Sequence, residues 1–247
     1  MELYDLAKEL NLGKVTKIFE KSWNELLDKY EKLRYSPIWC SEADLQLHLA
    51  HKLINKLGLD FVHIELPIPS EVELFFDELL YFGRISEKKY KYRSDIVVMN
   101  PYKQELYLIA ELKFTPIYWS FYLLMRDLEA KQEKKIEPAA EIIKMLKSTV
   151  NRIKQWRKYG PSESKVKNVY LKNVDKLIKI LSDFKDKEGK VVTGYFCVLD
   201  EIYPDIEERL KKEVEKYNPP DQFNLRVRHF RQALEGLEQI LVELQEP

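Results

Sequence analysis

Cysteine and glycine are scarce, with two and seven residues among 247. Cys40 and Cys197 lie far apart, without a C-x-x-C pair or a histidine cluster beside them, which argues against a disulfide framework or a zinc site. No apolar run approaches the length of a membrane span, and the N-terminal MELYDLAKEL lacks the pattern of a signal peptide. We therefore expect a cytoplasmic globular protein with no membrane partner. Abundant lysine and glutamate fit a thermophilic source.

The formal net charge is zero, yet the charges are segregated along the chain. The region 144–179 is rich in lysine and arginine and has only Glu163 and Asp175 as acids, whereas 60–83 contains acids and no lysine or arginine. Segregated blocks in a neutral protein can present a basic face to nucleic acid. A solvated helix surface explains the same lysines equally well.

Helical periodicity predicts an N-terminal helix over 15–30 and a second helix from the N-cap residue Ser41 to the stop at Gly58. A long helix is expected over 137–159 and a basic one over 170–184, with others near the C-terminus. Strands are predicted at 61–67, 90–99, 105–114, 191–200 and 225–230, while 71–82 fits either a strand or a helix. This order predicts an α/β fold with a mixed central sheet.

An acid and an acid–lysine pair occur in two adjacent predicted strands. Asp95 ends the run YRSD, and Glu111 and Lys113 lie in the apolar stretch LYLIAELKF. Side chains alternate along a strand, so Glu111 and Lys113 should share one face with Ile109 and Tyr107. Burying charge is costly unless the charge is paired or bound to a metal, and this cost indicates a functional site.

Glu42 and Gln46 fall on the core-facing stripe of the helix predicted over 41–58, whereas Asp44, His48 and His51 fall on the opposite side. A glutamate in the first turn also favours the helix dipole, which is the structural interpretation of Glu42. Its position on the core-facing stripe favours a place in the site.

The order helix, strands, Asp-x(15)-Glu-x-Lys across a hairpin, helix resembles the PD-(D/E)XK nuclease superfamily, with SD in place of PD. The resemblance covers about 41–200. It implies a restriction-endonuclease-like core, with 1–40 as a helical N-terminal extension and 201–247 as a C-terminal elaboration of helices and a strand. It also implies Mg²⁺-dependent hydrolysis of DNA, with Mn²⁺ as a substitute, by catalytic Glu42, Asp95, Glu111 and Lys113.

The chemistry expected of such a site assigns roles to these residues. Asp95, Glu111 and the backbone carbonyl of Leu112 would hold the metal through hard oxygen ligands. Lys113 would orient the attacking water or contact the phosphate. Gln46 is a supporting candidate. Alternatively, Lys113 forms an ordinary ion pair with one of the acids in an inert sheet.

The helix predicted over 137–159 carries a basic stripe beside its apolar one. Its nucleic-acid-binding candidates are Lys144, Lys147, Lys154 and Lys158. Gln155 and Tyr159 of the same helix resemble the Q-x-x-x-Y motif of the RecB-like branch and are candidates for a supporting role. On a helical wheel, however, both lie away from the apolar stripe.

Two other interpretations fit the same sequence. The fold can serve as a non-catalytic nucleic-acid-binding or assembly module, or the motif can be accidental in a structural α/β protein. The aromatic run IYWSFYLL at 117–124 favours a core or an oligomer contact over base stacking. A homodimer is compatible with cutting both strands of a duplex.

Overall fold

The computed structural model describes residues 7–32, 41–68, 92–115, 138–188, 191–230 and 232–243. The ambiguous segment 71–82 and the aromatic run 117–124 lie outside these residues. The described elements confirm the α/β class and the mixed sheet. The strands are β1 (Val62–Ile68), β2 (Tyr92–Asn100), β3 (Glu105–Thr115), β4 (Thr193–Asp200) and β5 (Phe223–His229).

The helices follow the predicted order, with small changes at their ends. They are α2 (Leu12–Lys32), α3 (Glu42–Leu57), α6 (Pro138–Tyr159), α7 (Glu163–Lys165), α8 (Lys172–Glu188), α9 (Ile206–Glu215) and α10 (Gln232–Glu243), with a 3₁₀ turn η1 (Leu59–Phe61). A π-helical segment, η3 (Val166–Leu171), leads into α8 and extends the helix predicted over 170–184. Among these described helices, none is long and apolar enough to cross a membrane.

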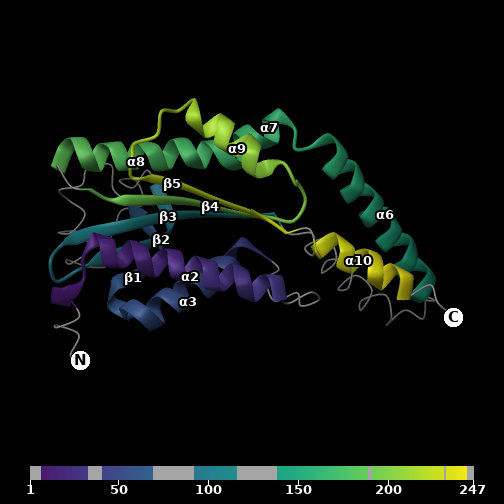
Figure 1. Cartoon of the computed structure of the whole chain (residues 1–247), viewed down its shortest axis with the longest axis horizontal. Coiled ribbons are helices and arrows are strands. Elements are labelled where there is room, and N and C mark those ends of the chain that lie inside the picture. Colours follow the sequence, from purple (N-terminus) through teal and green to yellow (C-terminus); the bar gives the residue numbers. More distant parts are fainter. Residues whose placement is uncertain are drawn as a thin grey trace.

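The five strands lie in the order β1-β2-β3-β4-β5. Neighbours from β1 to β3 are antiparallel, whereas β3, β4 and β5 run parallel to one another. Helices α2 and α3 cover one face of the sheet and α8 and α9 cover the other, while α6 and α10 lie side by side at one end (Figure 1). Strand β3 is therefore a central strand, with α3 on one side and α8 on the other.

Each face of the sheet has its own apolar core. Leu108, Ala110 and Leu112 of β3 pack with α2 and α3, and Cys197 is a buried free thiol of the same core. Ile109 of β3 packs on the opposite face with residues of β4 and α8. Because side chains alternate along a strand, Glu111 and Lys113 follow Ile109 onto the face covered by α8.

Tyr107 corrects one detail of the predicted alternation. It was expected on the face of Glu111, but its ring packs in the core of α2 and α3, and its hydroxyl donates to the Leu10 carbonyl at 3.1 Å. The cause is a register shift between Val98 and Met99, which pair with Leu108 and Leu106 and leave Tyr107 as the extra residue of β3. A bulge of this kind changes which face the following side chains occupy.

Helix α3 begins where the sequence predicts and for the expected reason. The Ser41 side chain accepts a hydrogen bond from the backbone N–H of Asp44 at 3.2 Å, and the helix ends at Gly58, whose φ of 98° favours glycine. Buried Leu45, Leu49 and Leu53 fix the orientation of the helix on the sheet. Glu42, in the first turn, is thereby directed towards β3.

Candidate functional site

A fork between β2 and β3 creates the candidate site. Among the described residues, the pairing of these strands ends at Ile96 and Ala110. Past that point β2 pairs with β1 alone, and β3 continues against β4 as far as Thr115. The backbone donors on the side of β3 that faces β2 therefore need other acceptors, because buried N–H groups are almost always hydrogen-bonded.

Two carboxylates supply these acceptors. Asp95 accepts from the backbone N–H of Leu112 at 2.6 Å, and Glu42 accepts from that of Phe114 at 3.4 Å. The acids thus replace the missing strand and extend along the edge of β3 at the fork. This arrangement brings an acid from α3 and an acid from β2 to the strand that carries Glu111 and Lys113.

The first strand is also distorted beside Asp95. Glu65 of β1 has a φ of 55°, which is uncommon for a residue with a side chain. Gln46 of α3 spans this irregularity, because its amide donates to the Asp95 carbonyl at 2.6 Å and to the Glu65 carboxylate at 3.3 Å. Gln46 is buried, as its position on the core-facing stripe predicted, and it holds the backbone of Asp95 in place.

Lys113 is held by Glu42. Its ammonium donates to the Glu42 carboxylate at 2.6 Å, and its side chain is 18% exposed while that of Glu42 is 39% exposed. The partner expected in an inert sheet was Asp95 or Glu111. The ion pair instead joins β3 to the first turn of α3, where both charged groups reach solvent.

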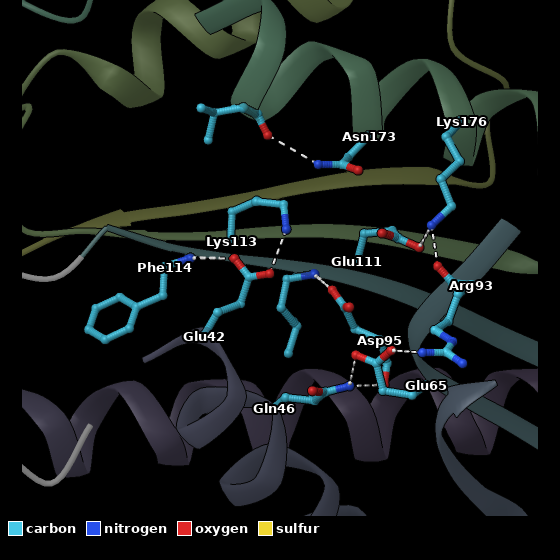
Figure 2. Close-up of polar contacts among 12 residues, drawn as sticks. Glu42, Gln46, Glu65, Arg93, Asp95, Glu111, Lys113, Phe114, Asn173 and Lys176 are labelled. Atoms are coloured by element: carbon cyan, nitrogen blue, oxygen red, sulfur yellow. Dashed lines mark hydrogen bonds and ion pairs between the residues drawn. The ribbon is translucent and has the colours of Figure 1, made fainter. Parts of the chain in front are cut away.

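Glu111 has a partner that the motif does not include. Its side chain is 3% exposed, and its carboxylate accepts from Lys176 of α8 at 2.7 Å. The same ammonium donates to the backbone carbonyl of Arg93 on β2. Figure 2 shows Lys176 reaching down from α8 to Glu111, opposite the side from which Glu42 and Gln46 approach.

Burial governs the electrostatics of the two strand acids. Desolvation raises the pKa of Glu111 to about 7; the Lys176 ammonium opposes this shift and the Asp95 charge adds to it. The pKa of Asp95 is also raised, chiefly by desolvation, against the lowering effect of the Leu112 N–H. Both acids are thus less readily ionised than in water, chiefly because burial disfavours their charged forms.

A divalent cation suits this donor set. The buried carboxylate of Glu111 and the half-buried carboxylate of Asp95 both have raised pKa values, and they are oxygen donors whose charge a metal ion would offset. In the described part of the chain, no three or more His, Cys, Asp or Glu residues form a group that could hold a metal. Mg²⁺ is often bound by only one or two carboxylates, with water and substrate phosphate as its other ligands. Two carboxylates are therefore enough protein ligands for Mg²⁺.

The remaining sequence candidates lie on α6. Lys144, Lys147 and Lys158 are exposed, and Lys154 forms an ion pair with Glu238 of α10 at 2.6 Å. Gln155 is exposed and Tyr159 is 75% exposed, in agreement with the helical wheel. The structure therefore brings Glu42, Gln46, Asp95, Glu111 and Lys113 together. A supporting role for Gln155 or Tyr159 stays a prediction.

In the sequence, Lys176 stands out only as one of the basic residues of the region 144–179. The signal that identifies it is positional: Lys176 precedes buried Leu177 and lies one turn from Asn173 and from buried Ile180. It therefore flanks the apolar stripe of α8, where a long side chain can reach the sheet. Periodicity places it near the sheet but does not identify Glu111 as its partner.

Comparisons with protein-family models, with curated proteins and with solved structures found no match.

The raised pKa of Glu111 leads to a testable pH dependence of stability. The folded protein holds a proton on Glu111 up to about pH 7, while the unfolded chain releases it near the ordinary value of 4.5. The stabilising contribution of the protonated group is therefore complete below pH 4.5 and is lost as pH rises through 7. In metal-free buffer we expect Glu111→Gln to remove this loss, on the order of 3 kcal/mol.

The measurement is urea unfolding of wild type and Glu111→Gln at pH 5 and pH 8. The difference in unfolding free energy between the two proteins should shift in favour of the variant at pH 8. Glu207→Gln is the matched control, because Glu207 forms only a surface pair with Lys211 on α9. A shift for Glu111→Gln no larger than that for Glu207→Gln would contradict the raised pKa.

Proposed function

We propose that the protein is a metal-dependent nuclease of restriction-endonuclease-like fold that hydrolyses DNA phosphodiester bonds. The observation that carries the proposal is the convergence of Asp95, Glu111 and Lys113 at the fork between two strands, with Glu42 from α3. The order of helix, hairpin and helix on opposite faces of the sheet supports the resemblance to the PD-(D/E)XK superfamily.

An accidental motif explains less of this arrangement. Random occurrence of Asp-x(15)-Glu-x-Lys does not require both acids and the lysine to meet, nor an acid from a third element to hold the lysine. A purely structural role accounts for Asp95 and Glu42 as backbone acceptors at the fork. It leaves Glu111 unexplained, since an apolar residue at this nearly fully buried position of a central strand would avoid the cost of burying charge.

The chemistry of the proposed reaction assigns a task to each residue. When bound to Asp95 and Glu111, Mg²⁺ would lower the pKa of a water ligand and neutralise charge on the phosphate. Lys113, partly exposed and oriented by Glu42, would donate to the phosphate or to the attacking water. Gln46 keeps Asp95 in register by holding its backbone carbonyl. The Leu112 N–H, by bonding one oxygen of Asp95, orients that carboxylate.

The direct test is cleavage of labelled duplex, single-stranded and branched DNA in Mg²⁺ or Mn²⁺. We expect Asp95→Asn, Glu111→Gln and Lys113→Met each to reduce the rate at least about 100-fold, because each removes a metal ligand or a charge at the phosphate. Glu207→Gln should cut at the wild-type rate. Cleavage that survives all three substitutions would show that the activity does not come from this site.

A non-catalytic nucleic-acid-binding module is the second candidate. The exposed lysines of α6 favour it, because phosphate contacts by Lys144, Lys147 and Lys158 require no metal. In this case the acids at the fork would only complete the hydrogen bonding of β3. The two functions differ in whether DNA is cut.

Replacing Lys144, Lys147 and Lys158 together by Gln tests this surface. If all three contact phosphates, affinity for duplex DNA should fall. The negative slope of log K against log salt should become less steep by about 2 to 3. A control variant replaces Lys211 and Lys216, each of which pairs with a neighbouring glutamate, and should leave the slope unchanged. An unchanged slope in the α6 variant would show that these lysines form an ordinary solvated helix surface.

A further inference from the structure

The candidate site contains two lysines, and they are held differently. Lys113 pairs with Glu42, which is 39% exposed, so this ammonium lies at the solvent side of the group. Lys176 pairs with Glu111, which is 3% exposed, and is itself 17% exposed. It belongs to α8, on the side of the sheet opposite α3. Of these two described lysines, Lys176 is the one that hydrogen-bonds to a carboxylate proposed as a metal ligand.

The position of Lys176 is that of a counter-ion. Buried Glu111 needs a positive charge nearby when it is ionised, and Lys176 provides it at 2.7 Å. A divalent cation held by Asp95 and Glu111 would provide the same compensation and would repel the ammonium. The two positive charges therefore compete for one carboxylate.

We propose that Lys176 is an exchangeable counter-ion: it neutralises Glu111 in the metal-free protein, and binding of a divalent cation displaces it onto a phosphate of the substrate. This inference rests on the proposed function. The long, flexible side chain allows the displacement, because the ammonium can leave Glu111 while the backbone of Lys176 stays anchored by buried Leu177. Lys176 and a cation held by Asp95 and Glu111 would then both supply positive charge to the phosphate.

Two lines of geometry support the exchange. Apart from Glu111, the acceptor that holds Lys176 is the Arg93 carbonyl, a neutral group on β2. Among the described residues, Lys176 therefore has no second ion pair to lose when it moves. Arg93 in turn extends towards Glu65 on β1 at 3.6 Å, so its guanidinium does not compete for Glu111 (Figure 2).

The test is calorimetric titration of Mn²⁺ into the full chain at pH 8.5, where competition from protons is weakest. Lys176→Met removes the competing charge, so we expect Mn²⁺ to bind about tenfold more tightly than to wild type. Lys176→Arg should bind Mn²⁺ no more tightly than wild type, because a guanidinium holds a carboxylate with two hydrogen bonds. Lys179→Met, on the same helix and paired with Asp175, should match wild type.

A purely structural lysine gives a different result. Its loss would loosen the site, and Lys176→Met would bind Mn²⁺ with unchanged or lower affinity, which would overturn the inference. If Lys176→Met does not fold, as judged by circular dichroism, Lys176→Arg provides the test. Tighter Mn²⁺ binding by Lys176→Arg than by wild type would overturn the inference. Absence of Mn²⁺ binding by wild type would instead refute the proposed metal-dependent function itself.

The second arm measures duplex DNA binding with and without Ca²⁺ as the probe cation. In wild type, Ca²⁺ should strengthen binding, because it places a positive charge at the fork and releases Lys176 towards the phosphate. Lys176→Met should lose a large part of this Ca²⁺-dependent increase although it binds the cation more tightly. An equal increase in both proteins would show that Lys176 does not reach the phosphate.

Discussion

The separation of β2 from β3 after Ile96 and Ala110 is the constraint on which the rest of the site depends. A central strand that loses one neighbour leaves backbone donors that must be satisfied inside the protein. Asp95 and Glu42 satisfy two of them with carboxylates. The same requirement therefore stabilises the fold and concentrates negative charge beside the buried strand that carries Glu111.

The acid–lysine pairs at the fork join β3 to helices on both faces of the sheet. The acids at the fork come from α3, β2 and β3, and the lysines that pair with them come from β3 and α8. Neither Asp95 nor Glu111 is ionised as readily as in water, since burial raises the pKa of each. The fork thus concentrates negative charge, and Lys176 compensates this charge at the buried Glu111.

Much of this arrangement could be predicted from residue patterns. Alternation in LYLIAELKF placed Glu111 and Lys113 on one face, and the apolar stripe of α3 placed Glu42 and Gln46 beside the sheet. The bulge at Tyr107 escaped prediction, because an extra residue in a ladder depends on how two strands pair. The Lys176–Glu111 pair could not be predicted either, because tertiary packing sets the contacts between distant elements, and periodicity does not encode that packing. The structural interpretation of Lys113 correctly predicts an ion pair, but the partner is Glu42 and not Asp95 or Glu111.

The central claim is that Asp95 and Glu111 together hold a divalent cation, and crystals of the protein grown with Mn²⁺ test it most directly. Anomalous scattering locates manganese independently of any assay. We expect one strong peak at about 2.2 Å from oxygens of both carboxylates, with the ammonium of Lys176 withdrawn from Glu111. A structure at saturating Mn²⁺ with no peak at the fork, and with Lys176 still bound to Glu111, would contradict the account.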